Sequence, residues 1–177
     1  MERKLRAAIT PLLGLILVLG CVLRFVGLMR GDLEDAGAFY HFHPDQQTLI
    51  NAAAHLNNPL DPPLTAYGLL PIYLAAGALK VGGLMAGEPL DLATTAGQRL
   101  AIISVRTLSA LISCLTLWLL WVCGRRYFGR WAALIAVVVM AVAPLAVQQA
   151  HFYTVDGSFC APRGSRRLRE PCRRRRG

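Results

Sequence analysis

Apolar residues in this chain gather into long blocks separated by polar connectors of very different length. Three blocks, residues 7–29, 100–123 and 131–149, are nearly free of charge. A helix needs about 20 such residues to cross a hydrocarbon core of ~30 Å, and each block is close to that length. Continuous apolar sequence, without the alternation typical of strands, indicates helices. The pattern therefore predicts an all-α integral membrane protein with three transmembrane helices.

The first block follows a basic N-terminus, residues 1–6, and allows three interpretations: an anchor, a cleaved signal peptide or a lipoprotein signal. Residues 18–21 loosely resemble a lipobox ending at Cys21. Apolar sequence continues past Cys21 with no small-residue cleavage site, which favours an uncleaved anchor. Arg24, near the end of this block, is expected to snorkel to the outer interface or to pair there.

Basic residues predict the orientation of the helices. The connector at residues 124–130 contains three arginines, and short basic connectors stay in the cytoplasm, as does a basic N-terminus. An even number of crossings must then separate the two. The blocks at residues 7–29 and 100–123 satisfy this by themselves. Residues 30–99 are therefore predicted to form an external loop, and residues 150–157 to begin a second one.

A fourth apolar block, residues 67–86, lies inside this external loop. It contains Pro71, Lys80 and several glycines, and it follows Asp61-Pro62-Pro63, which ends any preceding helix. Because a crossing here would break the even count, we predict an interfacial or re-entrant helix. An ordinary transmembrane helix is the alternative, since twenty mostly apolar residues are also typical of a span.

Composition agrees with the membrane class, with a mean hydropathy of +0.45 and 55% hydrophobic residues. The formal charge of +9 is concentrated at one end, because residues 158–177 contain eight arginines and one glutamate. Eleven basic and nine acidic residues remain before them, with no basic stripe interleaved with aromatics. No nucleic-acid partner is predicted. The five cysteines indicate neither a disulfide nor a metal site, since three lie in or at the ends of apolar blocks.

Two aspartates beyond the ends of apolar blocks, Asp45 and Asp156, are the main candidates for chemistry. A carboxylate at the lip of a membrane can serve as a base or a metal ligand toward a lipid-borne substrate. The two share a side only if residues 67–86 do not cross. Each also has a structural interpretation: Asp45 caps a short helix, which the spacing alone favours, and Asp156 is a solvated residue that ends one.

Two arginines and two histidines complete the candidates. Arg99 lies at the outer mouth of the predicted span at residues 100–123, and Arg106 lies about two turns inside it. An intramembrane arginine is costly and is by default functional or paired, and an anionic phosphate is a natural partner. His41 and His43 with one carboxylate do not make a specific ligand set, so solvated histidines are favoured over a metal site.

Short motifs follow one another in a set order along the chain. They are His43-Pro44-Asp45-Gln46, Asp61-Pro62, Tyr67-Gly68-Leu69-Leu70-Pro71-Ile72-Tyr73-Leu74, Arg106-Thr107-Leu108-Ser109-Ala110-Leu111, Gly124-Arg125-Arg126-Tyr127-Phe128-Gly129-Arg130 and His151-Phe152-Tyr153-Thr154-Val155-Asp156. With the basic N-terminus and first span, this ordered set resembles the start of a bacterial phospholipid-carrier-dependent glycosyltransferase. The class is that of the protein-mannosyltransferases and aminoarabinose transferases, glycosyltransferase family 39. The resemblance covers about residues 3–157 and implies the N-terminal part of a GT-C multi-span fold.

The resemblance also implies a function. A sugar would pass from a polyprenyl-phosphate-linked donor to a hydroxyl of a protein, lipid or glycan acceptor, at the extracytoplasmic face of the bacterial plasma (inner) membrane. Asp45 would be the catalytic base. Asp156 would help to hold the donor phosphate or a divalent cation, Mg²⁺ or Mn²⁺, with Arg99 and Arg106 supporting the phosphate. The positions expected to line the site or meet the acceptor are His43, Gln46, Tyr67 and His151. With the resemblance added, catalysis by Asp45 is favoured over capping, although relatives commonly have Asp-Glu where this chain has Asp45-Gln46.

Residues 158–177 depart from the family pattern, in which further spans are expected after Gly157. Their mix of Arg, Pro, Gly, Cys and Ser is what a GC-rich gene yields when read out of frame, and it is typical of disorder. The favoured hypothesis is a frameshift near codon 157 that leaves an inactive fragment. A genuine basic tail is the alternative, against the positive-inside rule. A different function class also stays open: a small non-enzymatic multi-span membrane protein or transporter subunit.

Overall fold

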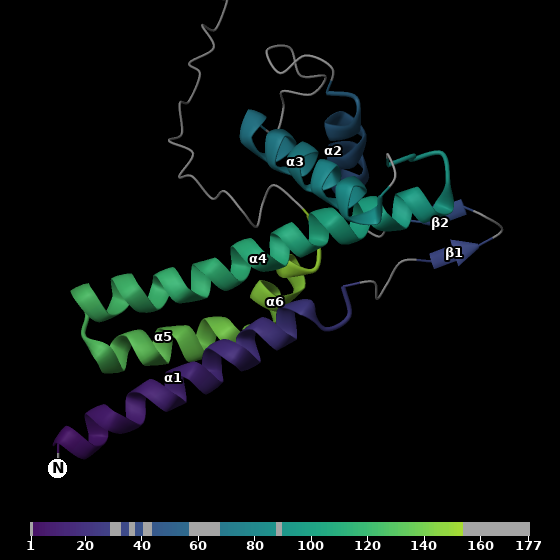
Figure 1. Ribbon diagram of the computed structural model, residues 1–177. Helices are drawn as coiled ribbons and strands as arrows, with labels where there is room; N and C mark the ends of the chain where they lie inside the picture. The colour runs from purple at the N-terminus through teal and green to yellow at the C-terminus, as the bar shows by residue number, and fades with distance from the viewer. Residues whose placement is uncertain are drawn as a thin grey trace, which may run out of the picture.

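The computed structural model of the chain describes residues 2–28, 33–35, 38–40, 44–56, 68–87 and 90–153. The regular structure of these residues is helical apart from one short antiparallel pair of strands (Figure 1). The elements are α1 (Glu2–Phe25), β1 (Leu33–Asp35), β2 (Ala38–Tyr40), α2 (Pro44–Ala54), α3 (Leu69–Ala86), α4 (Thr95–Tyr127), α5 (Arg130–Val142) and α6 (Pro144–Ala150). The predicted all-α membrane class is confirmed.

Three helices, α1, α4 and α5, lie side by side and form a bundle (Figure 1). The 33 residues of α4 extend roughly 50 Å at 1.5 Å per residue, longer than a bilayer core. The N-terminus of α1, the C-terminus of α4 and the start of α5 lie at the same end of this bundle. A cluster of apolar side chains packs at that end. Its buried members are Ile9, Trp121, Ala133, Leu134 and Val137. The basic N-terminus and the arginine-rich connector therefore lie at one end.

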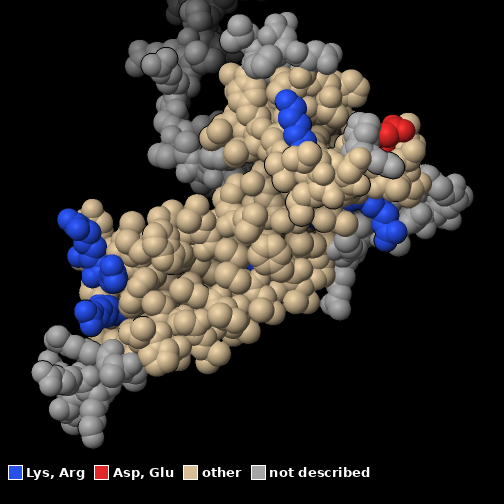
Figure 2. Space-filling view, viewed as in Figure 1, with Lys and Arg blue, Asp and Glu red and all other residues tan. Residues whose placement is uncertain are grey.

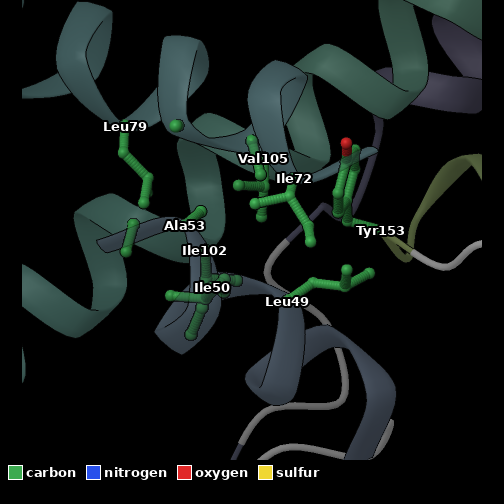
Figure 3. Close-up of a cluster of buried hydrophobic side chains, with 11 residues drawn as sticks. Leu49, Ile50, Ala53, Ile72, Leu79, Ile102, Val105 and Tyr153 are labelled. Atoms are coloured by element: carbon green, nitrogen blue, oxygen red, sulfur yellow. The ribbon is translucent and has the colours of Figure 1, made fainter. Parts of the chain in front are cut away.

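The opposite half of α4 is covered by α2 and α3 (Figure 1). Buried residues of α2 recur with the i, i+3, i+4, i+7 spacing of one helix face: Gln46, Leu49, Ile50 and Ala53. They meet a matching stripe of α3 and the α4 residues Ala101, Ile102 and Val105 (Figure 3). Tyr153, just after α6, joins this second core. The loop after α1 thus builds a small helical layer on one end of the bundle.

A close approach of backbones joins α3 to α4. A Cβ atom placed on Gly82 would overlap the hydroxyl group of Ser104, whereas one on Gly77 would meet nothing within 4 Å. Ser104 is held in place because its hydroxyl donates to the Leu100 carbonyl at 2.7 Å. Glycine at position 82 is therefore required by packing.

Two described helices, α3 and α4, are long and apolar enough to cross a membrane, and α5 with α6 would make a third span if the bent pair is counted as one. The predicted span at residues 131–149 is thus broken, with a bend of 61° between α5 and α6. Pro144 accounts for the break, because it has no N–H to continue the helix. Although α3 meets the length test, α1 and α4 run antiparallel, so the chain enters α4 at the end where it left α1 (Figure 1). Whether α3 lies at the interface or crosses the membrane stays a prediction.

Arg24 stabilises the bend and does not snorkel. Its guanidinium group is fully buried and donates to the carbonyls of Met140 at 2.9 Å and Ala141 at 3.2 Å. In a straight helix the N–H of residue 144 would bind the Met140 carbonyl, and proline removes that donor. Arg24 also donates to the hydroxyl of Ser113 at 2.7 Å. Of the two alternatives for Arg24, snorkelling to the interface or pairing, the structure shows pairing, because the nearby α5–α6 bend offers carbonyls to its guanidinium group.

Candidate functional site

Helix α2 positions Asp45 at the edge of the second core. The helix begins at Pro44, a residue favoured at the first helical position, and Asp45 follows within the first turn. A carboxylate there is stabilised by the positive end of the helix dipole. Asp45 is half-buried, while its neighbour Gln46 is 1% exposed. The helix thus holds a carboxylate at the boundary between core and solvent.

Gln46 connects three segments that are far apart in the sequence. Its Oε1 accepts from the Nε of Arg106 at 3.2 Å and from the backbone N–H of Tyr153 at 3.4 Å. Since both neighbours are donors, the oxygen of the amide must face them. The residue beside Asp45 therefore joins α2 to α4 and to the segment after α6.

The amide nitrogen of Gln46 points away from these donors. This Nε2 atom is buried and has no hydrogen-bond partner among the described residues. Leaving such a donor unsatisfied costs about 1–3 kcal/mol, so buried amides normally meet a protein, water or ligand acceptor. The site therefore has a donor that the described residues leave unsatisfied and that is suited to an oxygen acceptor.

Arg106 is the buried cation of the site, 1% exposed. Its Nη1 donates to the Leu28 carbonyl just beyond α1, and its guanidinium carbon lies 5.4 Å from the centre of the Phe152 ring. Placing a cation over an aromatic face adds attraction to the hydrogen bonds. Parts of α1, α2, α4 and the segment after α6 thus converge on one guanidinium group.

The segment after α6 is fixed by two further contacts. The Tyr153 hydroxyl donates to the Pro71 carbonyl of α3 at 2.6 Å, and the Ser109 hydroxyl donates to the Phe152 carbonyl at 3.1 Å. Burial raises the pKa of Tyr153 to about 12, so this hydroxyl keeps its proton and remains a donor. Phe152 and Tyr153 are consequently held beside Arg106 and Gln46.

The other described candidates lie around this cluster. His151 ties α6 to the end of α1: its Nδ1 lies 2.7 Å from the Val147 carbonyl and its Nε2 lies 2.9 Å from the Val26 carbonyl. Arg99 is exposed and shares a face of α4 with Arg106, roughly 10 Å away along the axis. His151 therefore has a positioning contact on each ring nitrogen, and Arg99 lies exposed near the start of α4.

The remaining predicted site residues, His43, Tyr67 and Asp156, lie outside the described residues. Within the described ranges, no group of three or more His, Cys, Asp or Glu side chains gathers as a metal site would require. The roles assigned to Asp45 and Asp156, and the divalent cation, stay predictions.

The sequence interpretation missed Phe152 and Tyr153 as parts of the site. A signal was present, because both belong to the motif that ends in Asp156, and Arg106 needs nearby groups to satisfy it. It placed Gln46 among the residues that line the site, but it did not predict that this side chain is buried against Arg106. Its place on the apolar stripe of α2 could have shown that it is buried.

Comparison with known proteins adds one finding. Residues 93–161 match the family model described as dolichyl-phosphate-mannose-protein mannosyltransferase. That stretch contains α4 with Arg99 and Arg106, the bent pair α5 and α6, and the segment that follows them; α2 precedes it. No curated protein and no solved structure matches the chain. Residues 93–161 are thus similar to a family of membrane glycosyltransferases.

Proposed function

We propose that this chain is the N-terminal part of a membrane glycosyltransferase that moves a sugar from a polyprenyl-phosphate-linked donor to an acceptor hydroxyl. The observation that carries the proposal is the buried Gln46–Arg106 contact directly beside Asp45, in a chain whose residues 93–161 match the mannosyltransferase family. Asp45, a half-buried carboxylate, directly precedes Gln46 in the first turn of α2, so a carboxylate, an amide donor and a cation come from one small region, which would suit a substrate with both a hydroxyl and a phosphate.

The chemistry needs one base and one charge-neutralising group. Asp45 would take the proton from the acceptor hydroxyl as its oxygen attacks the anomeric carbon. The bond from that carbon to the phosphate oxygen breaks, and polyprenyl phosphate leaves with the bonding electrons. Arg106 would stabilise the negative charge on the departing phosphate, and the Gln46 amide would donate to one of its oxygens. Asp156 would hold a divalent cation if the reaction uses one.

The length of α4 supports an extracytoplasmic site. Arg106 and Arg125 are roughly 28 Å apart along the axis, close to the ~30 Å thickness of a bilayer core. With Arg125 at the cytoplasmic border by the positive-inside rule, Arg106 reaches the opposite border. The fully buried α4 residues of the core shared with α2 and α3, Ala101, Ile102 and Val105, come before Arg106, so that helical layer would rest on the outer surface. The membrane would be the bacterial plasma membrane.

The test is sugar transfer by the full-length protein. The gene is first sequenced through codon 157 and beyond in all frames, and any apolar continuation is included in the expressed protein. Membranes then receive a labelled polyprenyl-phosphate sugar and acceptor. Asp45→Asn should lower transfer by about 10²–10⁴-fold, the usual contribution of a general base.

Asp91→Asn is the matched control. Asp91 is an exposed aspartate whose Oδ1 accepts from the Ala93 N–H at 2.9 Å, and asparagine keeps that acceptor. Its transfer rate should equal that of the unmodified protein. Full transfer by Asp45→Asn would refute the base assignment, whereas no transfer by the unmodified protein would favour a non-enzymatic membrane protein.

A further inference from the structure

The end of the bundle opposite the candidate site contains a basic pocket. It lies where α4 ends and α5 begins, has a volume of about 320 Å³, and is lined by Val122, Arg125, Arg126 and Arg130. The first three share a face of α4, because they are spaced i, i+3 and i+4. Figure 2 shows this group of basic side chains gathered at that end of the molecule. Three guanidinium groups thus surround one hollow.

Nothing within the described part of the chain neutralises these charges. All three arginines are exposed, and no hydrogen bond or ion pair joins their guanidinium groups to another described residue. The acidic residues whose side chains are described, Asp45 and Asp91, belong to the opposite end of α4. The start of α5 adds positive potential, since its N-cap, Gly129, has no side chain to satisfy the free N–H groups. The pocket therefore attracts an anion.

The surroundings identify the kind of anion. Tyr127, Phe128 and Trp131 flank the pocket with 74%, 79% and 52% of their surface exposed. Large aromatic side chains at a helix end are typical of the lipid headgroup level. We propose that this pocket binds the phosphate of an anionic glycerophospholipid, with its acyl chains along the apolar surface of α4 and α5. Arginine suits this role because its planar fork matches phosphate oxygens.

Topology alone would explain arginines on this side of the membrane, so the test must separate a binding site from general charge. The 177-residue chain is placed in nanodiscs of phosphatidylcholine with a small fraction of phosphatidylglycerol. Nanodiscs expose both faces of the bilayer, so the measurement does not depend on the orientation of the chain. The affinity of spin-labelled phosphatidylglycerol relative to spin-labelled phosphatidylcholine is measured. This readout does not depend on sugar transfer, so it can fail while the proposed function holds.

Arg126→Gln should lower the relative affinity for phosphatidylglycerol about fivefold, and replacement of all three arginines by glutamine on the order of 100-fold. Arg126→Lys keeps the charge and should retain most of the affinity. Lys80→Gln, which removes one exposed charge from α3, is the matched control and should have no effect. An equal loss in Lys80→Gln, or no loss in the triple variant, would overturn the proposal. Displacement of the lipid by soluble glycerol phosphate would show a free-phosphate site and overturn the lipid assignment.

Discussion

The buried contact between Arg24 and the α5–α6 bend yields a quantitative prediction about stability. Arg24→Met keeps a long side chain but removes every guanidinium donor. The carbonyls of Met140 and Ala141, bonded to Arg24 at 2.9 and 3.2 Å, then lose this partner. Each buried carbonyl left unsatisfied costs about 1–3 kcal/mol. Arg24→Met should therefore destabilise the protein by about 4 kcal/mol.

A second variant tests the reason for that cost. Pro144→Ala restores an N–H that can bind the Met140 carbonyl within a continuous helix. In the Pro144→Ala background, Arg24→Met should cost at least about 2 kcal/mol less, because an intrahelical donor replaces the guanidinium group. The free energy of unfolding of all four proteins is measured in mixed micelles from the loss of helicity.

The control is Lys80→Met, which removes an exposed cation from α3 and should change stability by less than about 0.5 kcal/mol. If Arg24→Met and Pro144→Ala proved additive within about 0.5 kcal/mol, the two would not share the carbonyls and the interpretation of the bend would fail.

Two smaller predictions concern packing around the site. Gly82→Ala should destabilise by about 1–3 kcal/mol, since its Cβ overlaps the Ser104 hydroxyl, whereas Gly77→Ala, in open space, should be neutral or stabilising; equal unfolding energies would contradict the α3–α4 contact. Tyr153→Phe should cost about 1 kcal/mol by removing the 2.6 Å bond to the Pro71 carbonyl. With the pKa of Tyr153 raised to about 12, the unmodified protein should hold its stability below pH ~10 and lose it as the pH rises toward 12. A Phe variant with the same alkaline loss would show that Tyr153 is not its source.

Much of the fold followed from local pattern. The apolar blocks at residues 7–29 and 100–123 correspond to α1 and α4 because continuous apolar sequence leaves few other solutions. The helix α4 extends further at its start than hydropathy indicated. Thr94 caps it there, accepting from the Gly97 N–H at 3.1 Å, so the helix begins in polar sequence. Hydropathy indicates the part of α4 that suits a lipid environment, whereas the cap at Thr94 sets the residue at which the helix begins.

Contacts between segments that are distant along the chain could not be predicted from the sequence. The sequence left open whether Arg24 snorkels or pairs, and only the position of the α5–α6 bend shows which carbonyls it meets. The pairing of Gln46 with Arg106 joins residues 60 apart in the chain. The sequence around either residue does not identify the other as its partner. The motifs correctly indicated which segments matter, while tertiary packing decides which of their atoms meet.

The most direct test of the central claim is donor binding by Arg106→Gln. Glutamine removes the buried guanidinium group, whose Nε donates to Gln46 Oε1 at 3.2 Å. If the Gln46–Arg106 site holds the donor phosphate, binding of a photoreactive polyprenyl-phosphate sugar should fall at least about tenfold, with helicity unchanged, because the cation that pairs with the phosphate is gone. Binding equal to that of the unmodified protein would contradict the assignment of this site to a lipid-linked sugar phosphate.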